Sequence, residues 1–190
     1  MANGRVITGY SKPYVAKYSA EGTTVTYTNG QPLARGVDIT IDVETTDDNR
    51  FYADNVVAEN EAGKFNSGTL TATVDGLKDA ANDLIMGLTT GNEYTDYDDD
   101  QSVPYMGFGC IVRYQEDGVE SYMPLVLPKV MFNEPGMEAA TQEEEIDWQT
   151  QELTAQILKD DTAKRKWKRR FKAVATEAEA EEKITDFLGI

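Results

Sequence analysis

Three aspartates at alternate positions, Asp96, Asp98 and Asp100, have the spacing with which a calcium-binding loop begins. Such a loop needs glycine at its sixth position and a glutamate that binds through both carboxylate oxygens at its twelfth. This chain has Gln101 and Gly107 at those positions. We therefore reject a calcium loop, interpret the aspartates as a solvated acidic segment, and expect neither a metal site nor a cofactor.

A second candidate is the run of residues 164–172, which contains seven lysines and arginines together with Trp167 and Phe171. Such a run can bind nucleic acid, because the cations attract phosphates and the rings stack on bases. The alternative is a strand over residues 164–174, in which the aromatic side chains anchor one face and the cations of the other meet an acidic neighbour. We favour the protein contact. The cations expected on that second face are Lys164, Lys166, Lys168, Arg170 and Lys172.

The remaining groups with reactive chemistry do not form a catalytic pattern. The single cysteine, Cys110, lies within an apolar strand pattern, and the chain contains no histidine that could activate it. We expect Cys110 to be a small core residue. The glycines of Gly107-Phe108-Gly109 do not match a phosphate-binding loop, and close backbone packing explains them better. We predict that the protein is not an enzyme.

Length and charge narrow the functional class further. A chain of 190 residues with a net charge of −16 is long enough for one domain, and its charge repels nucleic acid over most of the surface. The segment 1–163 carries −19, residues 164–172 carry +7, and residues 173–190 carry −4. One cysteine allows no internal disulfide, and no apolar run reaches the length of a signal peptide or a membrane helix. We expect a protein made in the cytoplasm that does not bind a membrane.

The elements that must position these residues are mostly strands. Residues 23–28 and 34–44 alternate around a turn at Asn29-Gly30, which predicts a hairpin. Residues 50–57 and 68–74 read as further strands. In residues 37–44 the aliphatic side chains are expected to face the core and the polar ones the solvent. The predicted solvated positions are Asp38, Thr40, Asp42 and Glu44 on one strand and Thr69, Thr71 and Thr73 on the other.

The rest of the chain adds two helices and three strands to this pattern. Residues 77–88 show helical periodicity after a capping corner at Asp75-Gly76, and a polar loop follows over residues 91–102. Strands are predicted over residues 105–114, 121–132 and 146–158, and Pro124 and Pro128 predict an irregular or edge position for the middle one. The capping box Thr176-Glu177-Ala178-Glu179 begins a last helix. Its expected inner stripe is Ala180, Ile184, Phe187 and Leu188.

Together these elements predict a mainly β fold of two packed antiparallel sheets, a β-sandwich, with one flanking helix and a short C-terminal helix. We expect a single domain over residues 1–190, with the basic strand and the last helix at about residues 164–188. No internal repeat is evident.

Several short segments of the chain, in their order and spacing, resemble the major tail proteins of long, non-contractile-tailed bacteriophages, of the type frequent among phages of Gram-positive bacteria. The similarity runs nearly end to end, although residues 164–172 are more basic than the family pattern. These segments are Pro13-Tyr14-Val15-Ala16-Lys17-Tyr18, Val25-Thr26-Tyr27-Thr28-Asn29-Gly30, Phe51-Tyr52-Ala53-Asp54-Asn55, Pro104-Tyr105-Met106-Gly107-Phe108-Gly109, Lys129-Val130-Met131-Phe132, and Phe171 followed by Thr176-Glu177-Ala178-Glu179-Ala180.

The resemblance implies a structural virion protein that assembles into hexameric rings, whose inner sheets join into a ring-wide β-barrel. Stacked rings form the tail tube, the conduit for the genome. The implied partners are further copies of the chain, the tape-measure protein and transiently DNA in the lumen, and the tail terminator and distal tail proteins. Two alternatives stay open: another virion component, such as a head-to-tail joining or capsid-decorating protein, and, least favoured, a small hydrolase.

Two sets of residues follow as expectations within that assembly. The solvated strand positions named above, Asp38 to Glu44 and Thr69 to Thr73, are expected to face the lumen, with the outer tube surface as the alternative. The residues expected to bridge subunits or rings are Asp47, Asp48, Phe51, Tyr52, Lys166, Lys168 and Arg170.

Overall fold

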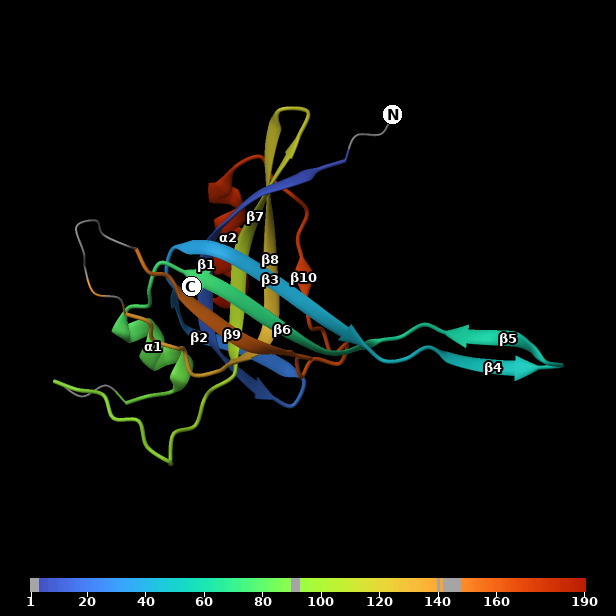
Figure 1. Cartoon of the computed structure of the whole chain (residues 1–190), viewed down its shortest axis with the longest axis horizontal. Coiled ribbons are helices and arrows are strands. Elements are labelled where there is room, and N and C mark those ends of the chain that lie inside the picture. Colours follow the sequence, from blue (N-terminus) through green and yellow to red (C-terminus); the bar gives the residue numbers. More distant parts are fainter. Residues whose placement is uncertain (1–3, 90–92, 140, 142–147) are drawn as a thin grey trace.

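The computed structural model describes residues 4–89, 93–139, 141 and 148–190, and antiparallel strands dominate it (Figure 1). Seven strands follow one another in the order β2-β1-β7-β8-β9-β6-β3, and the short β10 pairs with β8. A separate sheet, β4-β5, continues from the ends of β3 and β6. The elements of the described residues are β1 (Val6–Glu21), β2 (Thr24–Pro32), β3 (Gly36–Thr45), β4 (Asn49–Ala53), β5 (Val56–Glu61), β6 (Phe65–Val74), α1 (Asp79–Met86), β7 (Met106–Glu116), β8 (Val119–Phe132), β9 (Gln151–Leu158), β10 (Arg169–Arg170) and α2 (Glu177–Leu188).

The large sheet bends at β8, so that its two halves pack as the layers of a sandwich. β8 pairs with β7 along most of its length, and its last four residues, from Lys129 to Phe132, also pair with β9. In Figure 1 the strands β3, β6 and β9 run side by side across β7 and β8. The predicted fold class, mainly β with two packed antiparallel layers and two helices, is confirmed.

The main core fills the space between these layers. It is built from the inward positions of alternating strands, such as Leu70 and Ala72 of β6 opposite Phe108 and Leu127 of the other layer, all fully buried. Cys110 belongs to this core, as the sequence predicted. The helix α1 closes one end with Ile85.

A second, smaller core lies on the opposite side of β1, β7 and β8, where α2 packs. Thr176 caps the helix by accepting a hydrogen bond from the Glu179 backbone N–H (3.3 Å), one of the two bonds of the predicted capping box. Of the predicted inner stripe, Ala180, Ile184 and Leu188 are fully buried and Phe187 is half-buried. A Cβ atom at Gly109 would lie 2.5 Å from the Ile184 side chain. The glycines of β7 therefore let the helix approach the sheet closely.

The predicted hairpin between residues 23–28 and 34–44 is wrong. β2 pairs with β1 through a turn at Gly22, whose φ is +61°, whereas β3 pairs with β6 in the other layer. Asn29 does adopt a positive φ of 53°, but it forms a bulge inside β2, at the register shift opposite Ala16. Turn chemistry alone could not distinguish a bulge from a hairpin turn.

Three further boundaries differ from the predictions. Residues 50–57 form a hairpin of β4 and β5, because Asp54 and Asn55 take positive φ values of 50° and 62° and turn the chain between them. The helix expected over residues 77–88 is confirmed as α1, but Lys78 is its N-cap residue and Asp75 binds Arg35 instead. β9 begins only at Gln151, and residues 146–147 of the strand predicted over 146–158 lie outside the described residues.

The prediction for β8 was an irregular or an edge position. The edge position is wrong, because β8 is an interior strand, but the strand is irregular at Pro128, where its register with β7 shifts between Met106 and Phe108. The Pro124 carbonyl accepts a hydrogen bond from the Phe171 N–H (3.0 Å), which puts the missing N–H of Pro124 on the side of the short β10. Pro128 lies between the stretch paired with β10 and the stretch paired with β9. Both prolines thus avoid positions where a long ladder needs a donor.

Candidate functional site

The polar face of the sheet β3-β6-β9 brings together the acidic and threonine side chains that the sequence predicted as solvated. Register places Asp38 opposite Thr73, and Thr40 opposite Thr71, on neighbouring strands. Residues opposite each other in an antiparallel pair share a face. The polar face consists of Asp38, Thr40, Asp42 and Glu44 of β3, Ser67, Thr69, Thr71 and Thr73 of β6, and Glu152, Thr154 and Gln156 of β9.

This face is exposed to half-exposed, and the three strands contain no lysine or arginine. One hydrogen bond within it joins Ser67 Oγ, the donor, to a Glu44 carboxylate oxygen at 2.7 Å. The sequence did not predict that the β9 residues belong to this face, because nothing local in residues 152–156 reveals that β9 pairs with β6. The face therefore presents Asp38, Asp42, Glu44 and Glu152 without a cation on its own strands.

Lys129, Lys159 and Arg165 lie at one margin of the polar face, around a hollow that Asp42 and Glu44 also line. The Lys129 ammonium donates to Asp161 (2.7 Å) and lies 4.3 Å from the centre of the Tyr105 ring. This cation is thus already engaged within the chain.

The other side of β3 is apolar, but it is only partly covered. Ile39 and Ile41 are half-buried, whereas Val37 is 55% exposed and Val43 is 39% exposed. The expectation that this face is core is therefore only half correct. β3 ends the strand order, and the opposite layer does not reach over its full width.

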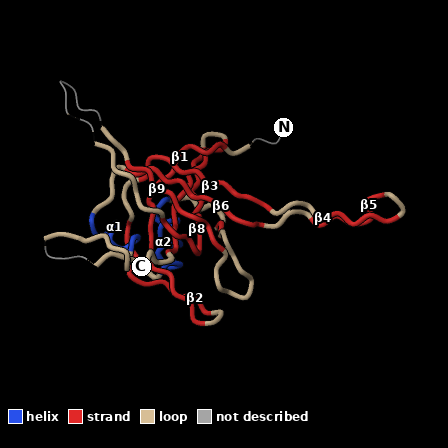
Figure 2. The backbone as a smooth tube through the Cα atoms, turned by 60° about the horizontal axis from the view of Figure 1, so that its bottom comes forward, coloured by secondary structure: helices blue, strands red, loops and turns tan. Residues whose placement is uncertain are grey.

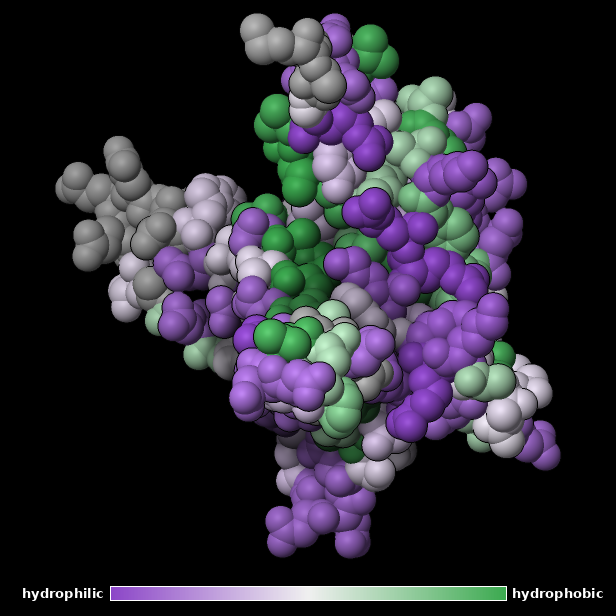
Figure 3. Space-filling model, turned by 90° about the vertical axis from the view of Figure 1, so that its right-hand side faces the viewer, coloured by the Kyte–Doolittle hydropathy of each residue, from purple (hydrophilic) through white to green (hydrophobic). Residues whose placement is uncertain are grey.

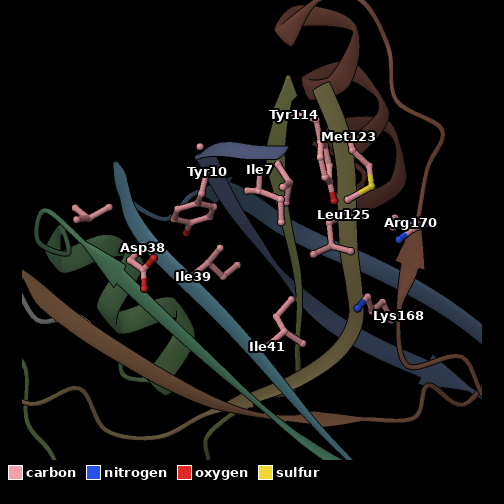
Figure 4. A pocket seen from close by; sticks show the side chains of 13 residues that line it. Ile7, Tyr10, Asp38, Ile39, Ile41, Tyr114, Met123, Leu125, Lys168 and Arg170 are labelled. Atoms are coloured by element: carbon pink, nitrogen blue, oxygen red, sulfur yellow. The ribbon is translucent and has the colours of Figure 1, made fainter. Parts of the chain in front are cut away.

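An open groove of about 420 Å³ results between β3 and the facing strands (Figure 4). Met123 and Leu125 of β8 form one wall, and both side chains are nearly buried. Figure 3 shows a recessed hydrophobic patch with hydrophilic residues beside it on this side of the molecule. The lining residues are Ile7, Gly9, Tyr10, Val37, Asp38, Ile39, Ile41, Val112, Tyr114, Met123, Leu125, Lys168 and Arg170.

Tyr10 of β1 is one of the residues that line this groove. Its hydroxyl is buried and has no hydrogen-bond partner within the part of the chain that the structure describes. Burial, more than the neighbouring Cys110 and Asp38, raises the pKa of this hydroxyl, so Tyr10 stays neutral. A buried unpaired hydroxyl costs about 1–3 kcal/mol of folding free energy.

The hairpin formed by β4 and β5 projects from the sandwich in both Figures 1 and 2. We call residues 47–61 the projecting hairpin. Its apolar side chains Phe51, Tyr52, Val56 and Val57 are all exposed, and Phe51 reaches 63%. Two of the predicted contact residues, Phe51 and Tyr52, thus lie together on one accessible element.

Asp47 and Asp48, at the base of the projecting hairpin, differ in their contacts. Asp48 accepts a hydrogen bond from the Gly63 backbone N–H (3.0 Å) and lies 3.9 Å from Arg50, so it helps to close the base. Asp47 is exposed. The chain reverses at Asp54 and Asn55 and leaves the tip open to solvent.

The basic segment is not the regular strand that the sequence predicted. Asp160, only 4% exposed, accepts hydrogen bonds from the Lys166 backbone N–H and the Thr162 hydroxyl, both at 2.7 Å. Its own N–H donates to the Lys166 carbonyl (2.7 Å). This buried carboxylate folds residues 160–166 into a loop, and only Arg169–Arg170 form β10.

The aromatic residues of the segment anchor it, as expected. Trp167 stacks on Phe65 with ring centres 4.4 Å apart and planes 8° from parallel. Phe171 packs edge-on against Phe187 of α2. Sequence reasoning missed Arg169, whose guanidinium lies 4.6 Å from the centre of the Phe187 ring.

The predicted cationic contact residues are therefore separated. Lys168 and Arg170 line the apolar groove beside β3. Lys166 lines a different hollow, with Thr26 and Tyr27 of β2 and Asp186 of α2. The structure brings two of the three predicted cations to one site and places the third on another surface.

The cysteine and the aspartates that the sequence offered as candidates for chemistry have ordinary structural surroundings. Burial raises the pKa of the Cys110 thiol to about 12, which keeps it protonated. Asp98 accepts a hydrogen bond from the Asp100 N–H (3.0 Å) within a turn. In the described ranges, no three histidine, cysteine or carboxylate side chains form a group that could hold a metal ion. Neither described helix is long and apolar enough to span a membrane.

A scan against protein-family models gave no match to this chain, and a search of curated proteins gave none either.

Proposed function

We propose that this chain is a tail-tube subunit of a long, non-contractile-tailed phage, a structural protein rather than an enzyme. The observation that carries the proposal is the polar face of β3-β6-β9, which spans three strands, is rich in threonine and carboxylate, and has no cation on those strands. A sheet with such a face on one side and a core on the other suits the wall of a water-filled conduit.

Two edges of the large sheet pair with no further strand in the described part of the chain, and they support assembly. β2 and β3 end the strand order of the large sheet, and they are nine and ten residues long. Edges of this length invite pairing with another chain, and closure into a barrel removes them. In the proposed hexameric ring, the inner layers of neighbouring subunits join into one barrel with the polar faces toward the lumen.

The charge of the polar face supports the role of a conduit. A basic wall would hold DNA, because binding to phosphates releases their condensed counterions. A wall of carboxylates and threonines repels the phosphates and offers no such gain. In this proposal Asp38, Asp42 and Glu44 line the lumen, DNA and the tape-measure protein occupy it, and terminator and distal tail proteins bind the two ends of the tube.

Electron microscopy of the purified protein tests the proposal. We expect hollow tubes of uniform width, formed without ligand at high protein concentration. Single rings that never stack would instead favour a head-to-tail joining protein. A chain that stays monomeric at every salt concentration, and that does not enter tubes with its tail partners, would contradict the proposal.

A further inference from the structure

The apolar groove beside β3 has the properties of an unfilled docking site. One wall consists of Val37, Ile39 and Ile41, and the other contains Met123 and Leu125 (Figure 4). The half-exposed isoleucines and the 55% exposed Val37 keep apolar surface in water. A contiguous exposed apolar hollow with a polar rim is typical of an interaction surface.

The projecting hairpin has the complementary property, apolar side chains without a surface to cover them. Pairing places Tyr52 opposite Val57 on one face, and Ala53 opposite Val56 on the other. Val56 is 61% exposed, and Tyr52 and Val57 are exposed as well. A two-stranded hairpin is marginally stable alone and gains stability when it packs on another surface.

The projecting hairpin and the rim of the groove also carry opposite charges. The projecting hairpin, residues 47–61, contains five acidic residues and one arginine and so carries −4. The groove is bordered by Lys168 and Arg170, which belong to the only strongly basic segment of the chain, residues 164–172 with +7. Such complementarity steers association and fixes its orientation.

We propose that the groove beside β3 binds the projecting hairpin of a second copy of this chain. The inference rests on the proposed self-assembly and names the contact through which it proceeds. Hairpin and groove are different surfaces, so a bound pair still has one free hairpin, on one copy, and one free groove, on the other. Such a heterologous contact repeats from copy to copy and gives rings or filaments, whereas a self-complementary contact would stop at a dimer.

Site-specific cross-linking tests the contact. Ile39→Cys in one batch and Val57→Cys in another place one thiol on the groove and one on the hairpin, and the buried Cys110 stays unreactive. After mixing, a short bis-maleimide should give covalent dimers, and neither variant alone should. Val119→Cys, at a more exposed site (69%, against 49% for Val57) at the start of β8, should give no dimers with Ile39→Cys.

Microscopy of the same mixtures separates the two proposals. Tubes without cross-linked dimers would overturn the hairpin contact and leave the tail-tube function standing. A protein that neither assembles nor cross-links would overturn both. Tubes together with dimers specific for the Ile39 and Val57 pair support both.

A charge exchange provides an independent measurement on exposed residues. Lys168→Glu with Arg170→Glu should raise the protein concentration needed for assembly about tenfold, because two favourable rim contacts become repulsive. Adding Asp47→Lys and Glu59→Lys on the hairpin should restore most of that loss. A fourfold variant that assembles no better than the twofold one would overturn the proposed pairing.

Discussion

Tyr10 and Tyr27 show how the same side chain has opposite consequences in two places. The Tyr27 hydroxyl donates to the Pro128 carbonyl (3.0 Å), whereas the buried Tyr10 hydroxyl has no partner among the described residues. An unpaired buried hydroxyl loses its hydration without compensation. The groove is thus lined by a residue that is not optimal for the stability of the single chain.

We predict that Tyr10→Phe raises the free energy of unfolding by about 1 kcal/mol, since it removes that uncompensated group. Tyr27→Phe, the matched control, should lower it by about 1 kcal/mol because it removes the hydrogen bond to the Pro128 carbonyl. Urea unfolding at low protein concentration measures both. A destabilised Tyr10→Phe variant would show that the hydroxyl has a partner in solution.

Glu181 of α2 joins the helix to β1. Lys12 donates to one of its carboxylate oxygens and Tyr14 to the other, and these bonds, the Lys12 one above all, hold the pKa of Glu181 below its usual range. A lowered folded-state pKa means stability that is complete above the unfolded pKa, about 4.3, and is lost as the pH falls through the folded value.

We therefore predict that Glu181→Gln lowers the free energy of unfolding by about 0.5–1 kcal/mol at pH 7, a size typical of partly exposed ion pairs. The difference from the unmodified chain should shrink as the pH falls below about 4. The neighbouring, exposed Glu182 serves as control, and Glu182→Gln should change little. Denaturation curves between pH 7 and pH 3 measure the effect. A difference that stays constant over that range would contradict the assignment.

At the scale of elements, the two sides of the strand β3 face different environments. Its polar side contributes Asp38 and Asp42 to the polar face, and its apolar side contributes Ile39 and Ile41 to the groove. Because side chains alternate with a period of two, a change on one side leaves the other in place. The two proposed roles of β3 can thus be tested separately.

We predict that Asp42→Lys with Glu44→Lys, two polar-face positions that do not line the groove, leaves tube formation intact and slows DNA ejection, because a basic lumen holds phosphates. The rate of ejection from phage that carry both lysines is the measurement. Glu134→Lys with Glu138→Lys, the same charge change at exposed positions outside the strands and the polar face, is the control. Normal ejection by the Asp42 and Glu44 variant would place those carboxylates on the outer surface instead.

At the scale of the whole molecule, the sandwich and the projecting hairpin are distinct units. The hairpin forms its own two-stranded sheet, and the cores lie within the sandwich and beneath α2. A chain without the hairpin should therefore fold. It should accept the hairpin of another copy in its groove and offer none in return.

We predict that a chain in which a short Gly-Ser turn replaces residues 49–61 is folded, forms no tubes alone, and shortens tubes when added in small amounts to the intact chain. The physical reason is that a heterologous contact stops growing at a copy that lacks one of the two surfaces. Circular dichroism checks the fold, and tube length in electron micrographs measures the effect. Tubes of normal length from the shortened chain alone would refute the prediction.

Patterns of short range could be read from the sequence. The alternation of residues 37–44, the threonines of β6 and the capping box of α2 depend only on neighbours within a few positions. The same holds for Cys110, whose apolar flanks already indicated burial. For these features a strand or helix imposes its periodicity whatever it packs against.

Only the tertiary structure shows which segments pair or form hydrogen bonds when they lie far apart in the chain. Sequence could not show that β3 pairs with β6 rather than β2, because strand pairing depends on free energies summed over both layers. Nor could it show that the buried Asp160 turns residues 160–166 into a loop. Lys168 and Arg170 reach the groove, and Lys166 does not, because a buried carboxylate takes the hydrogen bonds that a regular strand would have used.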